Sequence, residues 1–107
     1  MLEINNVEYE LKYPVNTLCL MDSDGINVLK LDSVLENLNM TTMRDLFYYG
    51  LKYENKKMTK NQAGELMDQF FNEGGTFNEI AEEEIKALAK ALGSSKAKVE
   101  DSEEEGK

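Results

Sequence analysis

Two acidic clusters are the groups of residues in this chain whose types could do chemistry. The segment 22–25 reads DSDG, which has the Asp and Gly content of a calcium loop. An EF-hand needs glycine at loop position 6, and that register places Leu20 at position 1, where an oxygen ligand is required. The glutamates at 82–84 are consecutive, so they spread over most of a helical turn and cannot share one catalytic pocket. We therefore predict an acidic turn at 22–25 and a solvated helix face at 82–84, with Glu82 paired to Lys86.

The chain has no histidine and one cysteine, Cys19. Without histidine there is no Ser–His or Cys–His nucleophile pair, and most zinc sites are excluded. Cys19 lies between two leucines with no cationic neighbour in sequence to activate its thiol, so we predict a small, buried core residue. One cysteine cannot form an internal disulfide, which fits a reducing compartment. The sequence thus predicts neither an enzyme nor a cofactor or metal site.

Four residues are candidates for contact with a partner: Tyr48, Tyr49, Tyr53 and Met58. Tyrosine is enriched at protein interfaces because it buries area while keeping a polar tip, and the methionine thioether suits varied apolar partners. The alternative for the tyrosines is packing at the edge of the core. The alternative for Met58 is a hydrophobic staple on Ala63.

The elements that would position these residues begin with a hairpin. Polar and apolar residues alternate over 1–13, and Asn5-Asn6 suits a two-residue turn because asparagine tolerates positive φ. A lone hairpin is marginal in water, so helices must cover its apolar face. The predicted register pairs Leu2 with Tyr9, Glu3 with Glu8 and Ile4 with Val7.

Helices are predicted for most of the remaining chain. Pro14 opens a short one that ends at 22–25; residues 26–31 are either extended or the lead-in to a helix from about Asp32, its cap, to Asn39. Helices starting at Thr42, Thr59 and Thr76 follow, the last two with capping boxes and all with apolar residues at helical spacing. The predicted core contains Leu46, Phe47, Leu66, Phe70, Ile80 and Leu88.

The predicted fold class is α+β: an N-terminal two-stranded β-hairpin packed on a small array of about four to five α-helices. One globular domain spans 1–93. Residues 94–107 hold no large apolar anchor and predict a disordered, acidic C-terminal tail.

The charge balance excludes several classes of partner. Acidic residues outnumber Lys and Arg by 21 to 12, for a net charge of −9. Binding to nucleic acid or anionic lipid needs clusters of basic residues, so neither is expected. The longest strictly apolar run, 18–21, is far shorter than the roughly 20 residues of a membrane span. With no signal-peptide pattern at the N-terminus, a cytoplasmic location is predicted.

Three segments, in order and spacing, resemble the tail assembly chaperones of long-tailed phages and prophages of Gram-positive bacteria. Residues 4–13 (INNVEYELKY) resemble the N-terminal hairpin of that family, with Asn6 where glycine is common. Residues 46–53 (LFYYGLKY) resemble its central helix, and residues 58–63 (MTKNQA) resemble the start of its next helix. The resemblance covers about residues 1–93.

The resemblance implies a non-enzymatic protein that coats the tape-measure protein during tail assembly and is absent from the finished virion. It also implies a longer, frameshifted form that recruits tail tube subunits; self-association stays open. An alternative is an acidic phage-encoded inhibitor or DNA mimic, which would block a nucleic-acid-binding host protein. A transcriptional or toxin-neutralising regulator would need a basic recognition helix, and its sole candidate, 52–60, is predicted to be a loop.

Overall fold

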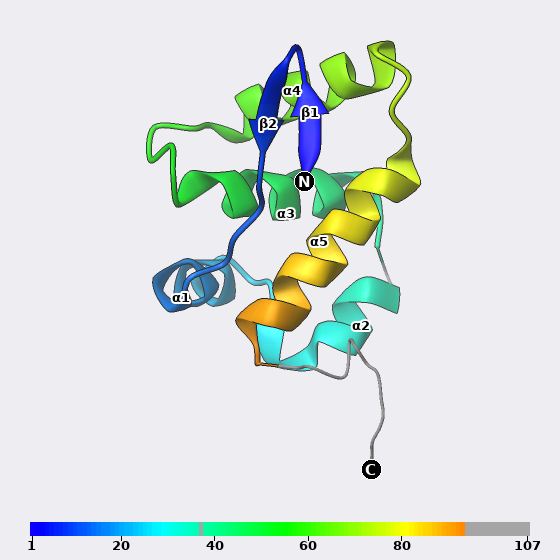
Figure 1. Cartoon of the computed structure of the whole chain (residues 1–107). Helices are drawn as coiled ribbons and strands as arrows, with labels where there is room; N and C mark the ends of the chain where they lie inside the picture. Colours follow the sequence, from blue (N-terminus) through cyan, green and yellow to red (C-terminus); the bar gives the residue numbers. More distant parts are fainter. Residues whose placement is uncertain (37, 94–107) are drawn as a thin grey trace.

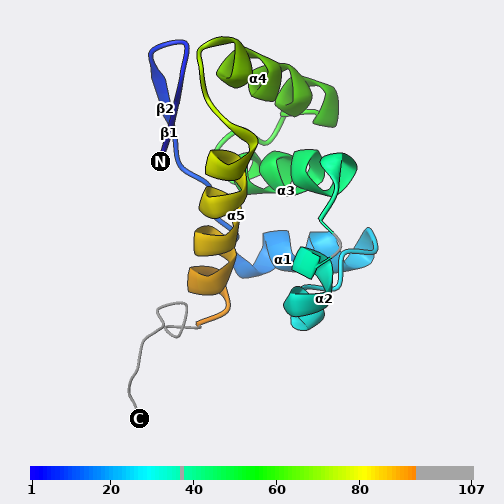
Figure 2. The same ribbon diagram turned by 90° about the vertical axis from the view of Figure 1, so that its right-hand side faces the viewer.

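The computed structural model describes residues 1–36 and 38–93 (Figure 1). A hairpin precedes five α-helices, which confirms the predicted α+β class. In Figure 2, α4, α3 and α1 form successive layers, and the hairpin and α5 lie along one side of them. The predicted disordered tail, 94–107, lies outside the described residues. The elements are β1 (Leu2–Ile4), β2 (Val7–Tyr9), α1 (Val15–Ser23), the 3₁₀ helix η1 (Val28–Lys30), α2 (Leu31–Glu36), α3 (Met40–Lys52), α4 (Lys60–Asn72) and α5 (Phe77–Ala91).

The hairpin has the predicted turn and register. Asn5 and Asn6 have φ values of 54° and 65°, the left-handed conformation at both central positions that a tight hairpin turn requires. All three predicted residue pairs are present. The backbone N–H of Asn5 donates to the Glu73 carboxylate at 2.9 and 3.0 Å, which ties the turn to the end of α4. Because α4 covers β1, Ile4 is fully buried, whereas Val7 on β2 is exposed.

The first helices differ in detail from the prediction. Pro14 is the N-cap of α1, and Cys19 is exposed, so its assignment to the core was wrong. A helical residue points about 100° away from its neighbour, and the inward direction is taken by Leu18. The segment 26–31, predicted to be either extended or the lead-in to a helix, contains η1 and leads directly into α2. Asp32 therefore lies in the first turn of α2 and does not cap it.

The three longer helices begin at side-chain caps. Asn39, and not Thr42, caps α3: the Asn39 side chain accepts a hydrogen bond from the Thr42 N–H at 2.9 Å. Both predicted capping boxes are present. In the first, Thr59 Oγ1 accepts from the Gln62 N–H at 3.1 Å, while the Thr59 N–H donates to Gln62 Oε1 at 3.0 Å. The box at the start of α5 is built in the same way.

The core surrounds α3, which contacts α1, α4 and α5. Five of the six predicted core residues are buried, and Leu66 is half-buried. On α5 the apolar pattern is interrupted, because Ile85 is exposed and Glu84 is buried. The core therefore contains a carboxyl group that the sequence reading had placed in solvent.

The segment after β2 passes close to α3 at Gly50. The Gly50 carbonyl accepts a hydrogen bond from the Lys12 N–H at 3.0 Å. A Cβ on Gly50 would lie 2.9 Å from both Leu11 Cδ2 and the Tyr13 hydroxyl oxygen, closer than side chains normally approach. The absence of a side chain at this position therefore allows the contact.

We expect Gly50→Ala to lower the free energy of unfolding by about 1–3 kcal/mol, because the strain of overpacking exceeds the gain in helix propensity. Gly64→Ala on α4 is the matched control: its Cβ would lie 3.5 Å from Arg44 Cδ, an ordinary contact, so its stability should be kept or raised. Urea denaturation followed by circular dichroism measures both. Equal stabilities for the two variants would contradict the close packing at Gly50.

Candidate functional site

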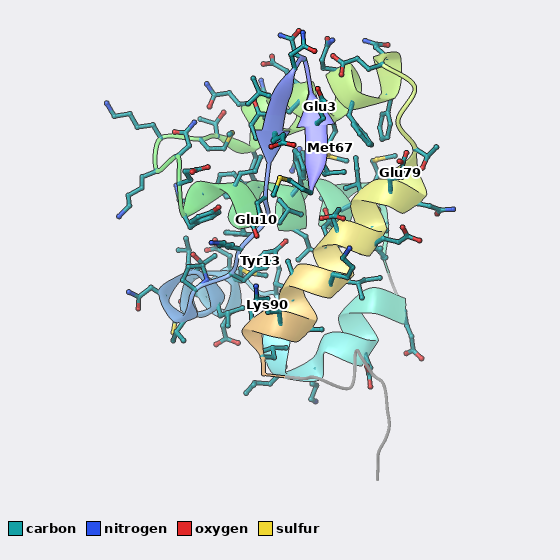
Figure 3. All side chains as sticks on the ribbon, viewed as in Figure 1. Glu3, Glu10, Tyr13, Met67, Glu79 and Lys90 are labelled. Atoms are coloured by element: carbon teal, nitrogen blue, oxygen red, sulfur yellow. The ribbon has the colours of Figure 1, made fainter. Side chains whose placement is uncertain are left out.

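A groove of about 590 Å³ runs between α5 and the segment that links β2 to α1. Figure 3 labels three of its residues, Glu10, Tyr13 and Lys90, along the border between these two parts of the chain. The volume lies in the range of ligand-binding clefts. Its lining consists of Met1, Glu10, Leu11, Lys12, Tyr13, Pro14, Val15, Glu83, Lys86, Ala87, Lys90 and Ala91.

The wall formed by the linking segment is fixed in place by the core. The Tyr13 hydroxyl donates to the Leu46 carbonyl at 2.6 Å, and Leu11 and Tyr13 are both buried. Val15, by contrast, is 70% exposed at the start of α1. The groove thus combines a rigid, largely apolar floor with an apolar side chain that is open to contact.

The other wall is one side of α5. Glu83, Lys86, Ala87, Lys90 and Ala91 are spaced three and four residues apart, so they share a helix face. Alanine at 87 and 91 leaves the space that larger side chains would fill. The α5 side of the groove therefore contributes small apolar residues to its floor and lysines to its rim.

Two carboxylates at the groove form ion pairs: Glu10, whose Oε1 lies 3.9 Å from Lys12 Nζ, and Glu83, which has a cation on each side. Its Oε1 lies 2.6 Å from the Met1 ammonium, and its Oε2 lies 3.4 Å from Lys86 Nζ. Burial acts to raise the pKa of Glu83, but these cations outweigh it and hold the pKa below its ordinary value. Lys86 thus pairs with Glu83, which corrects the predicted pair with Glu82.

The side chain of Glu84 points into the core and is 1% exposed, so the solvated-face prediction was wrong for this residue. Neither carboxylate oxygen has a hydrogen-bond partner among residues 1–36 and 38–93. Burial raises the pKa of Glu84 from its ordinary value of 4.5 to about 9, so the group is protonated at neutral pH. Burial raises the pKa of Tyr13 as well, and the negative charge of Glu84 adds to this once Glu84 has ionised at alkaline pH. A sequence signal existed: Ile80, Glu84 and Leu88 are each one helical turn apart.

The four candidate partner residues differ in how far their side chains are exposed. Tyr49 is 1% exposed and Met58 is 7% exposed, so neither offers contact area to a partner. Tyr49 hydrogen-bonds to the Asp24 carboxylate, and burial together with this bond raises the pKa of its hydroxyl. Tyr48 and Tyr53 are half-buried. A surface patch of all four residues therefore does not form, and core packing explains two of them.

Lysine ammonium groups approach the two rings that remain accessible. Lys52 Nζ lies 5.3 Å from the Tyr48 ring centre, and Lys12 Nζ lies 5.7 Å from that of Tyr53, both within cation–π range. The Tyr53 hydroxyl also donates to the Glu10 carbonyl at 3.2 Å. These two tyrosines have intramolecular partners, and the groove is the stronger candidate site.

Two further features concern the described part of the chain: metal sites and membrane-spanning helices. In the part of the chain that the structure describes, no cluster of three or more His, Cys, Asp or Glu residues is arranged to hold a metal ion. Nor does that part contain a helix with the length and apolar character needed to cross a bilayer. Fold and site together define a small α+β protein with an apolar, lysine-rimmed groove.

Comparison with known proteins places the chain in a family. It matches the family described as domain of unknown function (DUF5055) over residues 1–103, and it belongs to that family. Searches of curated proteins and of solved structures gave no match.

Proposed function

We propose that this protein is a non-enzymatic phage tail assembly chaperone that binds and solubilises the tape-measure protein in the cytoplasm of the bacterial host. It acts during tail assembly and is absent from the finished virion. The observation that carries the proposal is the groove, whose apolar floor has no covering element among the described residues. The resemblance of 4–13, 46–53 and 58–63 to such chaperones supplies the identity of the partner.

The groove fits one face of a helix better than it fits a small polar ligand. Amphipathic helices bind by laying their apolar side chains into grooves of this kind. A long helical tape-measure protein has apolar faces that stay uncovered until the tube forms around it. The net charge of −9 would keep the resulting complex soluble. Tail tube subunits would be recruited separately, by a longer, frameshifted form.

Co-expression with the tape-measure protein from the same genome tests the proposal. We expect the partner to stay soluble and to co-purify with the wild-type chain. Val15→Glu places a charge on the open edge of the groove and should reduce co-purification at least about tenfold, the effect of roughly 1.4 kcal/mol. Leu29→Glu is the matched control, because Leu29 is 86% exposed and does not line the groove.

Three results would contradict the proposal. If neither variant nor wild type keeps the tape-measure protein soluble, the chaperone function is wrong. If both variants bind equally well, the groove is not the binding surface. Apolar contacts persist at high ionic strength, whereas charge pairs are screened. If the complex dissociates in about 1 M salt, charge pairing dominates the binding, and an acidic inhibitor or DNA mimic becomes the better hypothesis for the function.

A further inference from the structure

The groove has a basic rim on an acidic protein. Of the 21 acidic residues in the chain, five lie in 94–107 and 16 lie before it, against nine basic residues in 1–93. The groove nevertheless brings together Lys12, Lys86 and Lys90 with the Met1 ammonium, against the two carboxylates of Glu10 and Glu83. The four cations outnumber the two carboxylates with which three of them pair, so the lining is net positive. The rest of 1–93 holds 14 acidic against six basic residues and is net negative.

We propose that the segment 94–107 of the same chain occupies this groove, with its acidic residues against the lysine rim. The segment holds five acidic residues against three lysines, at 96, 98 and 107, for a net charge of −2. Its five acidic residues all lie within 100–105 and supply the negative charge, and Val99 supplies an apolar side chain for the floor. This inference goes beyond the proposed function and can be tested without the tape-measure protein.

The segment 94–107 follows α5 closely in the chain, so it starts next to the groove. Lys90 and Ala91 line the groove, and the segment begins three residues after Ala91. The groove wall from Glu83 to Ala91 spans about 12 Å of helix, while ten extended residues reach about 33 Å. Glutamates 103–105 can therefore lie anywhere along the rim once the chain reverses direction. Attachment at one end also gives the segment an effective concentration in the millimolar range.

A second lysine-rich segment, 52–60, is the competing place for the acidic residues. It contains four lysines and connects α3 to α4. Figure 1 shows this connection well away from the C-terminal end of α5. The groove is favoured because it combines lysines, an apolar floor and the attachment point of the segment.

Zero-length carbodiimide crosslinking of the full chain tests the placement, because it joins a carboxylate only to a lysine in contact with it. At low salt we expect crosslinks from residues 100–105 to Lys12 and Lys86, in clear excess over those to lysines 52, 56, 57 and 60. An equal mixture of ¹⁴N- and ¹⁵N-labelled chains should give these crosslinks within one isotope. Mixed-isotope crosslinks would assign the groove to a second copy and overturn the proposal.

A full-chain variant in which three glutamates of the segment lose their charge gives an independent readout. In Glu103→Gln/Glu104→Gln/Glu105→Gln, we expect Lys12 and Lys86 to be acetylated several-fold faster than in the wild type. Lysines 56 and 57 should react equally in both proteins. High salt should raise the wild-type rates to those of the variant. Equal rates at Lys12 in the two proteins, or crosslinks spread evenly over all lysines, would overturn the proposal.

Discussion

Replacing Phe70 by alanine should lower the free energy of unfolding by about 3–5 kcal/mol, a large part of the stability of a small domain. Phe70 is 7% exposed on α4. Its ring packs so closely on Gly75 that a Cβ there would lie 2.3 Å from Phe70 Cε2. Truncation would thus open a cavity at the junction of α4 and α5, where the backbone cannot easily close it. Urea denaturation at neutral pH measures the change.

Phe77→Ala is the control for this prediction. Phe77 has the same side chain but is 37% exposed at the first position of α5, so its truncation removes less buried area and should have a clearly smaller effect. If Phe70→Ala unfolds at the same urea concentration as the wild type, the burial of Phe70 is wrong.

Replacing Glu84 by leucine should raise the free energy of unfolding by about 2–4 kcal/mol at pH 7. With its pKa raised from 4.5 to about 9, the side chain must take up a proton to stay buried at neutral pH. Each pH unit above the ordinary pKa adds about 1.4 kcal/mol to the unfavourable free energy of that step. Leucine removes both this requirement and the two carboxylate oxygens without hydrogen-bond partners among the described residues. Glu82→Leu on the exposed face of α5 is the control and should have little effect.

The raised pKa of Glu84 determines whether the folding stability rises or falls with pH. The folded state holds a proton on Glu84 that the unfolded state releases above pH 4.5, so the wild-type stability falls as pH rises from about 4.5 to 9. Glu84→Gln keeps the shape without the titration, and the stability difference between it and the wild type should grow over this range. Glu73 and Glu83, whose pKa values are lowered, are present in both proteins and cancel. A difference that does not change with pH would contradict the burial of Glu84.

Local features of the fold were predictable from the sequence because they depend on neighbouring residues. Asn5-Asn6 has few alternatives to a tight turn, and once the turn is set the alternation of side chains fixes the register. The caps at Thr59 and Thr76 likewise involve residues three positions apart. For α3 the prediction of a start at Thr42 was wrong, because the cap is Asn39, three residues earlier.

The candidate site was not predictable in this way. The groove exists because residues 10–15 lie beside α5, about 70 residues later in the chain, and no periodicity reports that contact. Tyr49 and Cys19 show the same limit, because a tyrosine near an apolar stripe suits a surface as well as a core, and a cysteine among leucines suits either side of a helix. Glu84 was misread for a different reason: its residue type outweighed a spacing that pointed inward.

The dependence of β1 on α4 also sets the order of events during synthesis. Leu2 and Ile4 leave the ribosome about 70 residues before Asn72, where α4, which covers β1, ends. At roughly 5–20 residues per second, these apolar side chains remain in water for several seconds before their cover is made. The hairpin cannot gain its buried side while the chain is growing through α3. Folding therefore completes late. A ribosome that stalls before α4 releases a fragment whose hairpin has an apolar face that α4 does not cover.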